Sequence, residues 1–283
     1  MCELDQLSEM SRISRRGFSA AGAMAALAAS VQVSAKASGG LAEAMVKFPT
    51  PTGMMDAFFV HPAKGKHPAV IIWPDIAGLR DAFKQMARRL AGEGYSVLVA
   101  NPFWQDAPAP QFADFNAWRT GGGMPKVQPW MAKNTQGAVM GAATAIVGWL
   151  DKQPSVDKKR GIGTQGYCMG GPFVVRTTAA VPSRVKAGAT FHGGGLVTEA
   201  ADSPIKLVTT AKASYLIAIA KNDDAQRPKE KDAIKAAMAA AGRRAEVEVY
   251  GGDHGWTVAD SPVYNQGEAE RAWTRLLALY ATL

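Results

Sequence analysis

Short apolar runs alternate with longer segments of helical periodicity along most of the 283-residue chain. The apolar runs end at Gly, Pro, Asn or Asp, and several contain no polar residue, which is typical of strands buried on both faces of a parallel sheet. Strands are predicted near residues 54–60, 69–73, 96–101, 161–166, 187–191, 215–220 and 245–250, and helices near 80–91, 135–150, 170–180, 229–241 and 266–281. This alternation predicts a single α/β domain, in which helices cover both faces of a mostly parallel sheet.

One segment, residues 103–131, interrupts the alternation. It contains several Pro and Gly together with aromatic side chains at Phe103, Trp104, Phe112, Phe115, Trp118 and Trp130. Long connections inside compact domains often form active-site covers or binding loops. The segment is therefore predicted to be a pocket lid in preference to a linker.

The N-terminus has the pattern of a twin-arginine export signal. Arg15 and Arg16 precede an apolar, Ala-rich stretch over residues 19–33, and Ala35-Lys36-Ala37 offers an A-x-A cleavage site. The stretch is short for a membrane span, although a retained anchor is left open. We expect residues 1–37 to be removed after export by the twin-arginine machinery, and residues 38–283 to form the mature domain in the periplasm or outside the cell.

Charge and cysteine content narrow the possible functions. The net charge of +8 comes from scattered basic residues with no basic helix bearing aromatics, so nucleic-acid binding is not expected. Cys2 would be lost with the signal, and the mature chain would keep Cys168 alone, which cannot form an internal disulfide. A lone thiol in an oxidising compartment favours a catalytic role for Cys168.

The surroundings of Cys168 have the pattern of a nucleophile elbow. Residues 166–171 read Gly-Tyr-Cys-Met-Gly-Gly between a predicted strand and a predicted helix. A sharp strand-to-helix turn exposes the nucleophile, and the flanking glycines avoid collisions of Cβ atoms. A thiol at the positive end of the following helix is also favoured as the thiolate. The alternative is a buried cysteine in a Gly-rich turn.

Two further residues follow the nucleophile in the order of a catalytic triad. Asp223 lies directly after the predicted strand at 215–220, and Asp224 remains an alternative acid. His254 lies in a Gly-rich loop after the strand at 245–250, where a histidine contributes little to packing. His254 would carry the proton of the thiol, and the carboxylate would fix its tautomer and stabilise the imidazolium.

A fourth part of the site follows the strand at 69–73. The backbone N–H groups of Ile76 and Met169 are candidates for an oxyanion hole. Asp75 would then lie beside the thiol. Its alternative role is the N-cap of the helix that starts near residue 79.

These motifs together resemble the dienelactone hydrolase family, a branch of the α/β-hydrolases that uses a Cys-Asp-His triad. The resemblance runs from about Met54 to the C-terminus and implies an α/β-hydrolase fold, with Cys168 as nucleophile, Asp223 as acid and His254 as base. It further implies that Asp75 stands where the family has a glutamate that contacts the resting thiol; the aspartate is one methylene shorter.

The family's substrate-binding residues match less well. Val258 replaces an arginine that grips a substrate carboxylate, and Arg119 lies in the loop that supplies a second one. Arg119 and Trp256, the latter from the His-Gly-Trp motif, are the substrate-binding candidates. We expect a preference for neutral esters or lactones unless Arg119 or another base compensates.

The sequence therefore predicts an exported, monomeric hydrolase of small esters or lactones that uses a Cys168 acyl-enzyme. No cofactor or metal is expected, because no metal-ligand spacing is present, and no stable membrane insertion is expected. The alternative is a non-hydrolytic periplasmic protein that uses the same pocket for ligand binding or redox sensing.

Overall fold

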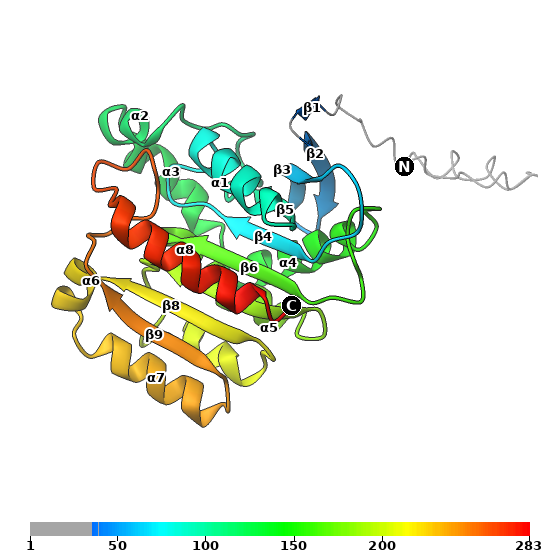
Figure 1. Ribbon diagram of the computed structural model, residues 1–283. Coiled ribbons are helices and arrows are strands. Elements are labelled where there is room, and N and C mark those ends of the chain that lie inside the picture. Colours follow the sequence, from blue (N-terminus) through cyan, green and yellow to red (C-terminus); the bar gives the residue numbers. More distant parts are fainter. Residues whose placement is uncertain (1–35, 39) are drawn as a thin grey trace, which may run out of the picture. The chain divides into compact units, whose positions relative to one another are not determined.

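The computed structural model describes residues 36–38 and 40–283, so most of the predicted export signal lies outside the described residues. Within the described part, nine strands form one sheet in the order β1-β2-β3-β5-β4-β6-β7-β8-β9 (Figure 1). The strands are β1 (Lys36–Ser38), β2 (Leu41–Thr50), β3 (Gly53–Pro62), β4 (Ala69–Trp73), β5 (Ser96–Ala100), β6 (Ile162–Tyr167), β7 (Val185–Phe191), β8 (Ser214–Ala220) and β9 (Ala245–Tyr250). The first strand therefore includes the last two residues of the predicted signal.

The predicted fold class is confirmed. Strands β4 to β9 pair in parallel, and β1, β2, β3 and β5 are joined by antiparallel pairing. Strands β4 and β5 are buried at every position, which explains why they read as continuous apolar runs. The carboxyl ends of the parallel strands meet at one edge of the sheet, where such folds place their ligand sites.

Helices cover both faces of the sheet (Figure 1). Helices α1 (Asp81–Gly92) and α8 (Gln266–Tyr280) pack on one face, where side chains such as Phe83 and Leu276 share a core with alternate strand positions. Helices α4 (Gln136–Leu150), α5 (Gly171–Ala180) and α7 (Glu230–Ala240) contribute to the two cores that contain Ile71 and Ile217. These five helices match the predicted ones to within a few residues at each end.

The two ends of the sheet differ in character. Strand β2 pairs with β3 over its whole length. It was not predicted, because its Ala, Glu and Lys residues interrupt the apolar pattern. Strand β9 is the other edge of the sheet, and its two glutamates form ion pairs with α8: Glu246 with Arg275, and Glu248 with Arg271.

Residues 103–131 contain two short helices that were not predicted, α2 (Phe115–Thr120) and α3 (Gly123–Ala132). Asp114 caps α2 by accepting a hydrogen bond from the Ala117 amide. A further helix, α6 (Lys221–Gln226), begins where β8 ends. Among the helices that the structure describes, none is both long and apolar enough to cross a membrane.

Candidate active site

Cys168 lies at the turn between β6 and α5. It is the first residue of a one-turn 3-10 helix, Cys168–Gly170. Its φ of 52° lies in the left-handed region that non-glycine residues rarely adopt. This strain holds the side chain out of the turn, and the thiol is free and partly exposed. The sequence thus folds locally into the strand–turn–helix shape of a nucleophile elbow.

The glycines around Cys168 are required by close backbone contacts. A Cβ atom on Gly166 would lie 2.1 Å from the carbonyl oxygen of Gly170, and one on Gly170 would lie 2.3 Å from that of Trp73. A Cβ on Gly171 would lie 2.5 Å from the Cα of Gly193. These separations leave no room for a side chain, so the elbow packs directly on the ends of β4 and β7.

The structure brings Asp223 and His254 together beside the nucleophile. The Nδ1 of His254 lies 2.7 Å from Oδ2 of Asp223, and the His254 amide donates to the side chain of Asn222 at 2.8 Å. The alternative acid, Asp224, instead accepts both its hydrogen bonds from Lys231, at 2.7 and 2.9 Å. The geometry therefore selects Asp223 over Asp224 as the partner of His254.

The environment of His254 favours its protonated form. Partial burial acts to lower the pKa of this imidazole, but the hydrogen bond to Asp223 and the interaction with the Cys168 thiol outweigh it and raise the pKa to about 10. A raised pKa means that the imidazolium is stabilised between two acidic groups. The arrangement suits a thiolate–imidazolium pair, which is the nucleophilic form of a cysteine.

A cavity of about 450 Å³ opens next to Cys168, and both oxyanion-hole candidates line it. Ile76 lies in the turn after β4, and Met169 follows the nucleophile at the start of the helix. Because Gly170 packs against the backbone of Trp73 and Pro74, the two turns that carry these amides lie side by side. The arrangement offers backbone N–H donors near a carbonyl that Cys168 attacks.

Asp75 makes its contacts with Arg80. Its Oδ1 accepts from Nη1 of Arg80 at 2.7 Å and from the Ala77 amide at 2.9 Å, and its Oδ2 accepts from Nη2 at 3.0 Å. Asp75 does not cap the following helix, because α1 begins at Asp81 with Arg80 as its N-cap residue. The shorter side chain is thus held by an arginine within its own loop.

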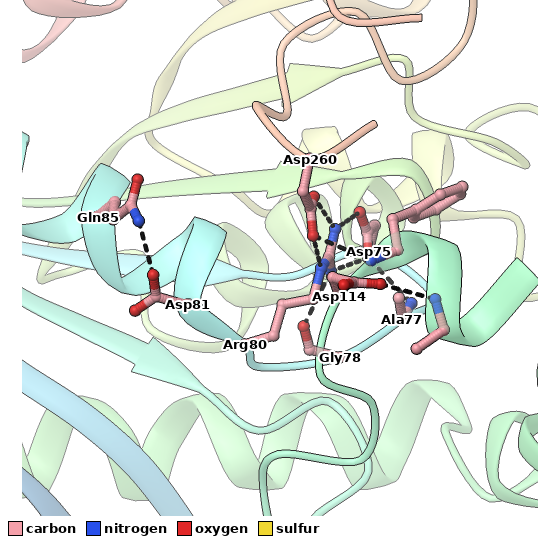
Figure 2. A network of polar contacts seen from close by, with 10 residues as sticks. Asp75, Ala77, Gly78, Arg80, Asp81, Gln85, Asp114 and Asp260 are labelled. Atoms are coloured by element: carbon pink, nitrogen blue, oxygen red, sulfur yellow. Dashed lines mark hydrogen bonds and ion pairs between the residues drawn. The ribbon is translucent and has the colours of Figure 1, made fainter. Parts of the chain in front are cut away.

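Arg80 also binds a second carboxylate, as Figure 2 shows. Its Nε and Nη2 donate to Asp260 at 2.6 and 2.7 Å, and the Oδ2 of Asp260 accepts from the Phe115 amide at 3.0 Å. The Arg80 side chain is fully buried, and these two carboxylates outweigh the burial and raise its pKa above the ordinary value. One guanidinium therefore joins the turn of Ile76, the loop after His254 and the start of α2.

The aromatic segment packs over the cavity. Phe103, Phe112 and Val127 form a buried cluster with Ile76, and the partly buried Met169 packs against the same cluster. The segment thus covers the two oxyanion-hole candidates that line the cavity, as a lid would.

Two predicted substrate-binding residues lie outside this cavity. Arg119 is exposed on α2, and its Nη2 donates to the side chain of Asn116 at 3.0 Å. Trp256 is fully buried in the core beneath the His254 loop, where it stacks on Tyr250 with ring centroids 5.4 Å apart. The assignment of Trp256 to substrate binding was therefore wrong, because the indole packs into the core and supports the loop from below.

Comparison with known proteins shows the family of the chain. The sequence model of the dienelactone hydrolase family matches residues 55–283. The chain belongs to the dienelactone hydrolase family. It is 24% identical over 250 residues to a candidate carboxymethylenebutenolidase of Salmonella typhi, covering 86% of this chain and 88% of the relative. It is 26% identical over 242 residues to a similarly named protein of Methylorubrum extorquens, covering 84% of this chain and 80% of that one.

Solved structures show the same fold. The crystal structure of a candidate dienelactone hydrolase from Klebsiella pneumoniae superposes with a TM-score of 0.73 at 22% identity, covering 86% of this chain and 99% of that one. This dienelactone hydrolase family member is accordingly a hydrolase of the ester or lactone type. Val258, where the family resemblance implies an arginine, is buried and carries no charge.

His192 is a residue of the site that was not among the predicted ones. It is buried directly after β7 with a φ of 42°, and the Cys168 amide donates to its Nδ1 at 3.2 Å. Its Nε2 lies 3.2 Å from the Thr257 hydroxyl, and its ring lies 4.8 Å from that of His254. Because Nδ1 accepts, the neutral ring carries its proton on Nε2. Burial and the neighbouring His254 hold its pKa well below the usual range.

Arg176 is the second residue that sequence reasoning missed. It lies on α5 and lines the same cavity as Cys168. Its position eight residues after the nucleophile was a usable signal, because a helix that starts at an elbow points one face into the site. In this dienelactone hydrolase family member, Arg176 places a cation at the cavity wall.

Proposed function

We propose that this protein hydrolyses small esters or lactones through a covalent acyl-enzyme on Cys168, without a cofactor. The observation that carries the proposal is the 2.7 Å contact between His254 and Asp223 beside the partly exposed thiol of Cys168, whose backbone is strained. Nucleophile, base and acid follow three strands whose carboxyl ends meet at one edge of the sheet. The same elements define acyl-transfer triads on unrelated folds.

The chemistry follows from the charges at the site. The Cys168 thiolate attacks the substrate carbonyl, and the amides of Ile76 and Met169 stabilise the oxyanion that develops. When the C–S bond forms, Cys168 loses its negative charge, and one of the causes that raise the pKa of His254 disappears. The imidazolium then releases its proton more readily to the alcohol oxygen, which leaves as the tetrahedral intermediate collapses to the thioester. The neutral His254 that results takes a proton from water, which attacks the thioester and regenerates the thiolate.

Asp75 acts in this scheme through the backbone. It binds the Ala77 amide at 2.9 Å while Arg80 holds both of its oxygens, so it fixes the turn that presents the Ile76 amide to the cavity. His254 and Asp223 supply the proton transfers, and the Asp75–Arg80 pair positions the oxyanion donors.

A matched pair of variants tests the triad. Asp223→Asn should lower kcat for a chromogenic short-chain ester by orders of magnitude, because the amide does not hold His254 in its tautomer or stabilise the imidazolium. Asp224→Asn changes the neighbouring carboxylate, which binds Lys231, and should leave kcat nearly unchanged. Equal losses in the two variants would contradict the assignment of Asp223.

The nucleophile is tested by Cys168→Ala. This variant should lose turnover while still unfolding in a single cooperative transition. Cys168→Ser should also be poor, because His254 is matched to a thiol and an alcohol needs a stronger base. For the wild type, mass spectrometry of the quenched reaction should show one acyl group on Cys168. Turnover by the alanine variant would exclude a Cys168 acyl-enzyme, and saturable binding without turnover by the wild type would indicate a binding protein.

We also propose that the protein is exported by the twin-arginine route and acts in the periplasm or outside the cell. The proposal is supported by Arg15 and Arg16, by the apolar stretch that follows and by the A-x-A site before residue 38.

A further inference from the structure

Arg176 is a cation of the active-site cavity whose charge is incompletely matched. Its Nη1 donates to the carbonyl oxygen of Asn134 at 3.1 Å, and its buried Nε has no hydrogen-bond partner. Among the described residues, no carboxylate lies within ion-pair distance of its guanidinium. Burial lowers the pKa of Arg176, and the charge of Asp202 opposes this only in part. A guanidinium that lines a cavity without a carboxylate in ion-pair contact can bind an anionic ligand there.

The position of Arg176 on α5 directs it toward the substrate. Met169, Pro172 and Phe173 precede it by seven, four and three residues, so the four side chains share one helix face, and all four line the cavity with Cys168. A helical side chain leans toward the helix N-terminus, which here carries the nucleophile. With a rise of about 1.5 Å per residue, the Cα of Arg176 lies roughly 7–8 Å along α5 from the first residue of that helix, Gly171.

The cavity is suited to the acyl part of a substrate. The leaving alcohol must lie next to His254, which donates its proton, and His254 is not among the residues that line the cavity. The oxyanion candidates Ile76 and Met169 do line it, beside Cys168. An acyl chain that starts at the Cys168 thioester therefore extends along α5 toward Arg176.

We infer that Arg176 forms an anion-binding subsite, and that the enzyme hydrolyses esters whose acyl chain ends in a carboxylate several ångströms from the scissile carbonyl. This inference rests on the proposed function. The sequence predicted a neutral substrate unless another base compensates for the arginine that the family resemblance implies at position 258. Arg176 is such a base, so the inference reverses that prediction. The charge of Arg176 lies on the cavity wall formed by α5, at some distance from Cys168. Open-chain monoesters of dicarboxylic acids have an acyl chain that can span this distance.

Matched esters and variants test the subsite. The probes are 4-nitrophenyl hydrogen adipate and its neutral methyl ester, compared by kcat/KM. The wild type should favour the anion by about 10- to 100-fold, the typical range for one charge-assisted contact in a partly desolvated site. Arg176→Gln should bring this ratio close to one, and Arg176→Lys should retain part of it. Arg244→Gln, at an exposed position before β9, removes the same charge from the surface and should leave the ratio unchanged.

The outcomes separate this inference from the proposed function. Suppose that both esters are turned over, but the wild type shows a kcat/KM ratio near one, or Arg176→Gln shows the same ratio as the wild type. Either result would overturn the subsite and leave the proposed hydrolase function intact. A loss of the ratio in Arg119→Gln instead would place the anion site on α2. If neither ester is turned over, the affinity for free adipate is measured by calorimetry. Equal affinities of the wild type and Arg176→Gln would overturn the subsite. A lower affinity of Arg176→Gln than of the wild type would support it.

Discussion

Replacing Arg80 by Met should be severely destabilising. The Arg80 side chain is fully buried between Asp75 and Asp260, which accept four hydrogen bonds of 2.6–3.0 Å from it. Methionine keeps much of the packing volume but leaves the buried carboxylate of Asp75 and the partly buried carboxylate of Asp260 without a cation. Removing one partner from a buried ion pair typically costs about 3–5 kcal/mol. For a domain of this size, that loss lowers Tm by roughly 6–20 °C.

The matched control is Arg89→Met in α1, the helix that Arg80 precedes. Arg89 pairs with Glu270, but both side chains are about half exposed, at 45% and 47%. An exposed pair contributes about 0.2–1 kcal/mol, and the stacking of Arg89 on Trp273, 4.1 Å from the ring centroid, adds about 0.5–1 kcal/mol. The control should therefore lose no more than about 2 kcal/mol.

The pH dependence of the Arg80 variant gives a second readout, which a packing defect alone would not produce. In the wild type, burial acts to raise the pKa of Asp260, but the hydrogen bonds from Arg80 lower it overall. Without Arg80, burial would raise the pKa of Asp260, so this carboxylate would bind a proton more readily in the native state than in the unfolded state. The deficit should then shrink as the pH falls from about 7.5 to about 5.

Urea unfolding at both pH values measures these effects, provided that the transitions are reversible. The double variant Arg80→Met with Asp260→Asn should recover part of the loss, because it removes one unpaired charge. A deficit no larger than that of Arg89→Met, or one that does not change with pH, would refute this account of the cluster.

Three further predictions follow from the site and the signal. His192→Phe should lower kcat by roughly tenfold, because it removes the acceptor of the Cys168 amide, whereas His192→Asn should retain most of it, since its Oδ1 can replace Nδ1; equal losses would argue against this role. The raised pKa of His254 stabilises the folded state, and this stabilisation is fully present below the pKa of the imidazole in the unfolded state. Urea unfolding should show it disappearing as the pH rises toward about 10. In Cys168→Ala it should disappear at a lower pH, and an unchanged pH range would exclude a contribution of the thiol. Changing Arg15 and Arg16 together to Lys should trap the precursor in the cytoplasm, and mature protein in the periplasmic fraction would contradict the twin-arginine route.

The parallel sheet could be predicted because its strands carry a local signal. Residues 69–73 are apolar at every position, and the structure gives β4 the same bounds. Strand β2 was missed because its pairing with β3 stabilises it, while its sequence mixes Ala, Glu and Lys with apolar residues. Pairing between strands is not visible in a local pattern.

The site divides in the same way. Asp223 and His254 could be located because each follows a recognisable strand. The contact of Arg80 with Asp260 joins positions 180 residues apart, and no short-range spacing indicates it. His192 has the same property, since its partners Cys168 and Thr257 lie on other loops.

The ion pairs along β9 bear on self-association. An edge strand leaves a row of backbone donors and acceptors that a second copy could extend into a larger sheet. On β9, Glu246 and Glu248 alternate with Ala and Val and are bound to Arg275 and Arg271 of α8. A strand that added to this edge would place its side chains beside these fixed charges, which is unfavourable for an apolar strand. The ion pairs that attach α8 to β9 thus also disfavour the addition of a strand from a second copy at this edge of the sheet.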